Sequence, residues 1–315
     1  MTPPHLLLPR IPRPFTRPFL RVLVPRLPFA RTFVPSFHQV FASRLFLVVF
    51  CSLCCDVVAA QSQETSPSFR RTAHATSFGL GSANQLDSYL SPLSYRGPQL
   101  HLLHETQRTT HLLDSCVSFQ TLLQADLAYT HNQTENANDL GGFLHFDAAW
   151  HYNWQTHSPF RLFLGPQLGA TLGGLYNTRN GNNPAQATAA IRLSVSAAAI
   201  YSFHLWHQPI ILRDQLDIPL LGAMFSPAYG QSYYELFTLG NTDHNICFTH
   251  PFNAPSLRNR LTIDIPLRWC TLQAGYLLDI RQSNVNELKR RNVTHAFVIG
   301  WTRRLMILPQ SPKKR

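Results

Sequence analysis

The residues best suited to chemistry lie in one segment, 226–255, which is rich in tyrosine and asparagine. Asp243 and His244 are adjacent there, and Ser232 and Glu235 stand shortly before them. Such residues can serve in acid–base or nucleophilic catalysis. The chain has no Gly-x-Ser-x-Gly and no His-Glu-x-x-His motif to accompany them. The pattern therefore leaves enzymatic activity open and favours its absence.

Tyrosines and amides form a second set, in the same segment and in an earlier Asn-rich one at 177–184. Tyrosine rings beside amides suit contact with a glycan or a lipid headgroup. The candidate ligand-binding residues are Asn180, Asn182, Asn183, Tyr229, Tyr233 and Tyr234. His244 and His250 lack a third ligand for a metal ion, so the sequence predicts neither metal nor cofactor.

Charged residues form a third set, which recurs on one face of alternating segments. Acids and arginines nearly balance, and buried charges need partners. We therefore expect them to form a crosslinked plug inside a narrow lumen rather than an ion path. This predicted charge network comprises Glu105, Asp126, Asp147, Arg192, Arg213, Asp217, Arg260, Asp264, Asp279 and Arg281.

The segment 142–155 shows which element must position such residues. Leu144, Phe146 and Trp150 alternate with His145 and Asp147. Successive side chains of a strand point to opposite faces, so the segment is a long strand with one apolar and one polar face. A lipid-facing wall with an interfacial aromatic girdle has this pattern, although a half-exposed soluble strand has it too. The predicted girdle is Trp150, Tyr152 and Trp154.

Other segments repeat this alternation, which predicts ten strands, with twelve as the alternative count. Short connections alternate with long ones such as Ser82–Pro92, Ser226–Pro255 and Gln282–Thr294. This arrangement favours an all-β, antiparallel, up-and-down transmembrane β-barrel over a soluble β-sandwich. The expected strands are His74–Gly81, Leu93–Gln107, Asp114–Thr130, Gly142–Gln155, Phe160–Tyr176, Ala187–His204, Ile210–Met224, Arg258–Leu267, Leu272–Arg281 and His295–Ile307.

The N-terminal region has a different composition. Residues 1–43 hold nine prolines and six arginines without periodicity, which predicts a disordered extension. A start codon assigned too far upstream would also explain it. Residues 44–60 combine a basic residue, an apolar run and Ala59-Ala60, as in a signal peptide cleaved after Ala60. The remaining predicted parts are a linker at 61–73, the barrel at 74–308 and a basic tail at 309–315.

The net charge of +11 does not indicate a nucleic-acid partner. Residues 1–60 contain seven arginines and one acid, so they supply +6 of that total. The rest of the chain has no dense basic cluster with exposed aromatic residues between its charges.

Three runs carry a family resemblance: Asn84–Leu93, Tyr176–Gln186 and Phe225–Glu235. They resemble an uncharacterised family of Bacteroidetes-type outer-membrane β-barrels, known as a domain of unknown function. The resemblance covers about Phe78–Leu305. It implies an exported barrel and no established activity or catalytic residue.

Together, the patterns predict a monomeric barrel in the outer membrane, in contact with its lipid. Its expected role is structural or the binding of a glycan or lipid headgroup by its long surface loops. The two alternatives are a hydrolase of lipid or glycan that uses segment 226–255, and a channel for small solutes.

Overall fold

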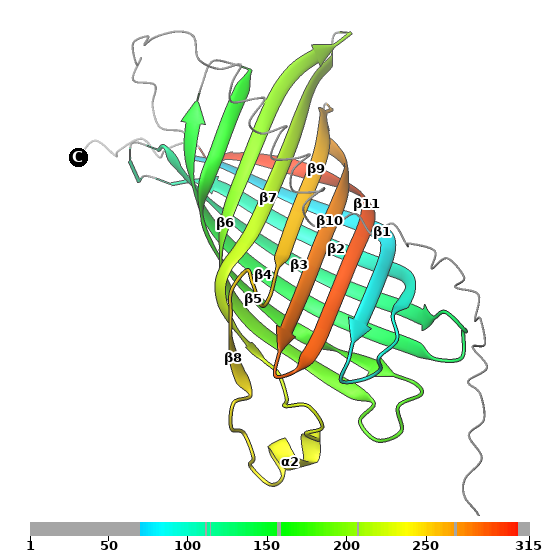
Figure 1. Ribbon diagram of the computed structural model, residues 1–315. Helices are drawn as coiled ribbons and strands as arrows, with labels where there is room; N and C mark the ends of the chain where they lie inside the picture. Colours follow the sequence, from blue (N-terminus) through cyan, green and yellow to red (C-terminus); the bar gives the residue numbers. More distant parts are fainter. Residues whose placement is uncertain are drawn as a thin grey trace, which may run out of the picture. The chain divides into compact units, whose positions relative to one another are not determined.

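The structure is a computed structural model that describes residues 70–307, except 111, 114, 156–158, 207, 268 and 269. The predicted extension, signal peptide and basic tail lie outside the described residues. The described chain forms one antiparallel sheet (Figure 1). Its strands are β1 (Arg70–Asp87), β2 (Tyr95–Thr109), β3 (Val117–Asn132), β4 (Asn138–Gln155), β5 (Phe160–Asn177), β6 (Ala185–Leu205), β7 (Gln208–Phe225), β8 (Ile246–Thr249), β9 (Ser256–Pro266), β10 (Thr271–Val285) and β11 (Leu288–Ile307).

Ten of these strands close into a ring. Their order is β6, β5, β4, β3, β2, β1, β11, β10, β9 and β7, and β7 pairs with β6 again. The first and last strands pair from Arg70 with Ile307 to Asp87 with Arg290. The short strand β8 adds to β7 only, beyond the part of β7 that pairs with β9. The predicted ten-stranded antiparallel barrel is therefore confirmed.

The strands form because their side chains alternate between two different environments. On β4, Phe146 and Trp150 are exposed, whereas His145, Asp147 and His151 are buried. Leu80 is 62%, Leu127 64% and Phe297 74% exposed on three other strands. Monomeric soluble proteins rarely expose a contiguous apolar patch of more than a few hundred Å². This barrel thus has an apolar exterior and an interior in which polar residues predominate.

Aromatic residues gather at one end of the outer face. Trp150, Tyr152 and Trp154 are exposed at the end of β4, beside the connection 156–159. The ring centroids of Tyr152 and Trp154 lie 4.7 Å apart, and those of Phe119 and Trp150 lie 5.0 Å apart. The predicted girdle residues thus occupy one rim of the barrel.

The barrel has two ends that differ in their connections. We call the end with 110–116, 156–159, 206–207 and 267–270 the turn side. The opposite end, with 88–94, 133–137, 178–184, 226–255 and 286–287, is the loop side. Segment 226–255 contains β8 and the short helix α2 (Tyr233–Phe237).

Four strands, β1, β4, β10 and β11, extend at least four residues further toward the loop side than predicted. β1 runs from Arg70 to Asp87, past both ends of the expected strand. β11 begins at Leu288, so the predicted long connection Gln282–Thr294 is wrong. Asn286 and Glu287 alone connect β10 to β11, with φ of 51° and 61°. Two left-handed residues at the centre are typical of a tight type I′ hairpin turn.

No helix among the described residues has the length and apolar character needed to cross a membrane.

Candidate functional site

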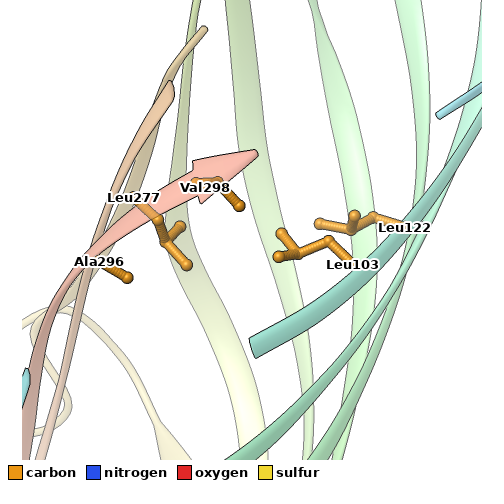
Figure 2. Packing of buried hydrophobic residues seen from close by; sticks show 5 residues of the cluster. All are labelled: Leu103, Leu122, Leu277, Ala296 and Val298. Atoms are coloured by element: carbon orange, nitrogen blue, oxygen red, sulfur yellow. The ribbon is translucent and has the colours of Figure 1, made fainter. Parts of the chain in front are cut away.

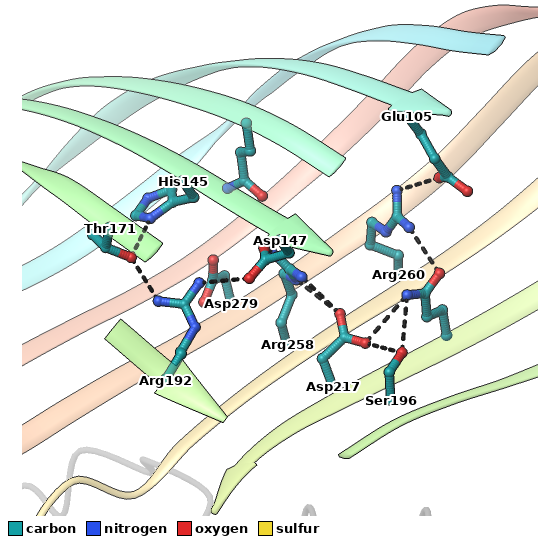
Figure 3. A network of polar contacts seen from close by, with 12 residues as sticks. Glu105, His145, Asp147, Thr171, Arg192, Ser196, Asp217, Arg258, Arg260 and Asp279 are labelled. Carbon is teal, nitrogen blue, oxygen red and sulfur yellow. Dashed lines mark hydrogen bonds and ion pairs between the residues drawn. The ribbon is translucent and has the colours of Figure 1, made fainter. Parts of the chain in front are cut away.

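The interior of the barrel contains two groups of ion pairs, and the first centres on Asp147 of β4. Arg258 Nη1 lies 2.6 Å and Arg192 Nη2 3.1 Å from the Asp147 carboxylate. Arg258 Nη2 also lies 2.8 Å from Asp217 Oδ2 on β7 (Figure 3). β4 and β9 are not neighbours in the ring, so the pair between Asp147 and Arg258 crosses the lumen.

The second group centres on Glu105 of β2. Its Oε1 lies 2.6 Å from Arg213 Nη1 of β7, and its Oε2 lies 2.8 Å from Arg260 Nη1 of β9. Ionised hydrogen bonds of this kind are about twice as strong as neutral ones. β2 and β7 lie on opposite sides of the ring, so this group also spans the lumen.

Histidines join the network through Asp126 of β3. His101 Nδ1 lies 2.7 Å and His145 Nε2 3.2 Å from the Asp126 carboxylate. The Arg281 guanidinium of β10 contacts the His145 ring and pairs with Asp279. The contact between Arg281 and His145 is a third polar bridge across the lumen, because β4 and β10 lie opposite each other.

The ten residues of the predicted charge network all lie on inward-facing positions of the strands, and most of them meet one another. Asp264 is half-buried and accepts a hydrogen bond from Gln273 Nε2 at 3.0 Å. The predicted network missed Arg258, although this residue shares its strand face with Arg260 and the same alternation would have included it. His101 and the pair of Asp87 with Arg290 were also missed.

Apolar side chains fill further parts of the lumen. One cluster combines Leu103, Leu122, Leu277, Ala296 and Val298, which point toward one another from β2, β3, β10 and β11 (Figure 2). A second cluster, near the turn side, combines Phe163, Ala198 and Ile200 with Ile211 packed against it. The lumen is therefore occupied by both polar and apolar groups.

Toward the loop side the interior opens into a cavity of about 180 Å³. Arg192, Asp217 and Arg258 border it, together with Asp87 and Arg290 of the rim. A separate void of about 10 Å³ lies beside Glu105, Arg213, Gln215, Arg260, Thr262 and Gln273. One water molecule needs roughly 10–15 Å³ on this scale. The loop-side cavity can thus hold on the order of ten waters, whereas the void holds about one.

The loop-side connections meet over the rim at Tyr233. Its hydroxyl donates to Gln186 Oε1 at 2.8 Å and accepts from the Ala187 amide at 2.6 Å. The Tyr89 ring packs edge-on against it, with centroids 5.8 Å apart. Burial is the largest cause that raises the pKa of Tyr89 to about 12, and burial also raises the pKa of Tyr233. Both hydroxyls are therefore neutral at ordinary pH.

The other candidate ligand-binding residues do not share the contacts of Tyr233 over the rim. Asn180 Oδ1 accepts from the amides of Asn182 and Asn183 at 3.1 Å, and Asn180 Nδ2 donates to Leu90 O at 3.0 Å. Asn180 thus shapes its own turn and ties it to the neighbouring connection. Tyr229 and Tyr234 are exposed to solvent.

The four candidate catalytic residues do not form one site in the structure. Ser232 and Glu235 form the capping box of α2: the Glu235 amide donates to Ser232 Oγ, and the Ser232 amide donates to Glu235 Oε2. Asp243 and His244 are exposed. Among the described residues, no hydrogen bond joins the two pairs, and no cluster of three or more metal-binding side chains occurs.

A model of the family described as "Protein of unknown function (DUF3316)" matches residues 45–312. No curated protein matches the chain.

Among solved structures, the outer membrane protease OmpT from Escherichia coli is similar at 7% identity and a TM-score of 0.45, over 76% of this chain and 99% of that one. The translocator domain of the autotransporter NalP from Neisseria meningitidis is similar at 11% identity and a TM-score of 0.38, over 85% and 96%. Structures this distant do not indicate an activity for this chain. Its closed barrel is established by its own strand pairing.

Proposed function

This chain belongs to the DUF3316 family, whose description assigns no activity, and from its geometry we propose a closed outer-membrane barrel that binds a ligand. The loop-side cavity is the proposed binding site, and the loop side faces the cell exterior. The observation that carries this proposal is a cavity of about 180 Å³ that ends on ion pairs crossing the lumen.

Three features support a place in the outer membrane. The exterior is apolar around the ring, and the aromatic rim at Trp150, Tyr152 and Trp154 has the composition of an interfacial girdle. The closed ring satisfies backbone hydrogen bonds between strands, as a membrane-spanning sheet requires. The predicted signal peptide at 44–60 would export the chain.

Ion pairs across the lumen support the proposal that the barrel is closed to ions. Glu105 bridges Arg213 and Arg260, and Asp147 and Arg258 pair across the same interior. Removing one partner of a buried ion pair leaves an uncompensated charge, which costs about 3–5 kcal/mol. Hydrated ions would have to break such pairs and displace the apolar cluster around Leu103 in order to pass.

The cavity has the features of a small-molecule site. Binding sites are concave, largely apolar and carry a few convergent polar groups. Here Phe143, Leu175 and Met224 supply apolar wall, whereas Arg290 and Gln85 supply polar groups. The neighbouring connections over the rim, tied together by Tyr233, would control entry from outside.

Conductance in planar lipid bilayers tests the closed lumen. We expect the purified protein to show no stable conductance above the lipid baseline. A variant with Glu105→Ser, Arg213→Ser and Arg260→Ser removes one complete ion group without leaving an unpaired charge, and its ion leak should increase. Large, long-lived pores formed by the unmodified protein would overturn the proposal.

A further inference from the structure

Arg290 differs from Arg192 and Arg258 of the loop-side cavity because none of its donor nitrogens has a hydrogen-bond partner among the described residues. Its side chain is 11% exposed, and its Nε lies 3.4 Å from Asp87 Oδ2. Within the residues that the structure describes, its Nε, Nη1 and Nη2 have no hydrogen-bond partner. A guanidinium carries five N–H donors, so this buried cation has unused donor capacity.

Two arginines further inside the cavity have partners. Arg258 is shared between Asp147 and Asp217, and Arg192 donates to Asp147 and to the hydroxyl of Thr171. These pairs neutralise the inner part of the cavity.

Arg291, which also lines the cavity, donates from Nη2 to Asn84 and Ser94 at the rim, and its Nε has no partner among the described residues. The unmatched arginine donors of the cavity therefore lie at the rim, where β1 and β11 pair.

A second unused donor, on Gln85, lies on the strand that pairs with the strand of Arg290. Gln85 is on β1, two residues before Asp87 and on the same strand face, and it also lines the cavity. Its Oε1 accepts from Thr130 Oγ1 at 3.4 Å, and its buried Nε2 has no hydrogen-bond partner in the described chain. Two unused donor groups favour a ligand group rich in acceptor oxygens.

The apolar part of the cavity lining indicates what the ligand carries besides its anionic group. Phe143, Leu175, Ala190, Pro219 and Met224 line the same cavity with apolar groups. A small inorganic anion would leave this wall in contact with water only. An apolar chain attached to the anionic group would bury the wall as well.

On the basis of the binding role proposed above, we propose that the loop-side cavity binds an amphipathic anion. Its carboxylate or phosphate accepts hydrogen bonds from Arg290 and Gln85, and its apolar part lies against Phe143, Leu175 and Met224. The ligand can come from a membrane lipid or from solution, since both sources offer this chemistry.

Isothermal titration of the full-length protein in phosphatidylcholine nanodiscs tests the proposal, with decanoate, dodecyl phosphate, decanol and inorganic phosphate as probes. We expect decanoate and dodecyl phosphate to saturate one site. Arg290→Gln should weaken both roughly tenfold to a hundredfold, as loss of a charge-assisted hydrogen bond implies. Lys289→Gln removes a positive charge from the adjacent, exposed position and should leave binding within about twofold.

The substitution Asp87→Asn should change the affinity for the anion in the opposite direction from Arg290→Gln. This carboxylate competes with the ligand for Arg290, so its neutralisation should tighten decanoate binding several-fold. The asparagine can keep the hydrogen bond that Asp87 Oδ1 accepts from the Tyr89 amide. A variant that merely disturbed the fold would weaken binding instead, and a normal circular dichroism spectrum checks each variant.

The outcomes separate the anion site from the closed barrel. Equal decanoate affinity of Arg290→Gln and the unmodified protein would overturn the anion site. Decanol binding as tight as decanoate would overturn it too, while leaving a ligand cavity in place. Saturation by inorganic phosphate at equal affinity would refute the amphipathic requirement. Absence of binding for every probe would refute the site, whereas only conductance decides whether the lumen is closed.

Discussion

At the scale of single residues, Glu105 has the largest predicted effect on stability. It accepts hydrogen bonds from Arg213 and Arg260 inside the lumen. Glu105→Gln should lower the free energy of unfolding by about 3–5 kcal/mol, because two buried guanidinium groups lose their counter-charge. Urea unfolding followed by tryptophan fluorescence measures this difference.

Glu135→Gln is the matched control for Glu105→Gln, since Glu135 is exposed in a loop-side connection. It should change the unfolding free energy by less than about 0.5 kcal/mol. Equal stability of the two variants would contradict a supporting role for the lumen network. Adding Arg213→Gln to Glu105→Gln should recover part of the loss, because one unpaired charge disappears.

The sequence predicts which residues face the lumen but not which of them meet. Alternation predicts that Glu105, Arg213 and Asp147 face the lumen, because successive side chains of a strand point to opposite faces. The height of each side chain in the barrel depends on the register and tilt of strands far apart in sequence. The pair of Asp147 with Arg258 spans 111 positions, which no local pattern encodes.

At the scale of elements, the alternation predicts ten strands correctly but places the loop-side ends of β1, β4, β10 and β11 at least four residues too close to the turn side. The segment Lys289-Arg290-Arg291-Asn292 of β11 is polar on both faces. A strand that extends beyond the apolar band has no lipid to select apolar residues, so its period-two signal ends before its hydrogen bonding does. The same reason explains why β1 continues to Asp87.

Helix α2 provides a prediction that separates a structural role of Ser232 from a catalytic one. Ser232→Ala removes the side-chain acceptor of the capping box and should destabilise α2 by about 1 kcal/mol. Limited proteolysis should then cut segment 226–255 faster, while urea unfolding of the barrel stays unchanged. Thr242→Ala, an exposed change in the same segment, is the control and should not alter the cleavage rate.

At the scale of the whole molecule, the apolar exterior and polar interior invert the arrangement of a soluble domain. The sequence indicates this inversion, because apolar residues alternate with charges that recur from strand to strand. The cavity could not be predicted, since it depends on which inward side chains leave space unfilled. Nor could the unpartnered donors of Arg290 be recognised within a segment that the sequence predicts to be a loop.

The proposed orientation can be measured by cysteine labelling in whole cells. With Cys116, Cys247 and Cys270 changed to serine, Gly181→Cys places a thiol in open space on the loop side. We expect a membrane-impermeant maleimide to label it on intact cells.

Leu112→Cys, on the turn side and exposed, provides the counterpart to Gly181→Cys. It should react only after the outer membrane is permeabilised. Labelling of Leu112→Cys but not Gly181→Cys on intact cells would reverse the orientation.

The pairing of β1 with β11 makes closure of the barrel depend on its two most distant strands in sequence. Residues as distant as Arg70 and Ile307 must find each other, and such long-range contacts slow folding because closing a long loop costs entropy. Before that, the open edges of β1 and of its growing sheet can pair with other chains. The lumen charges also lack their partners across the ring until it closes. Closure of the ring should therefore be a late and concerted event, which requires every strand from β1 to β11.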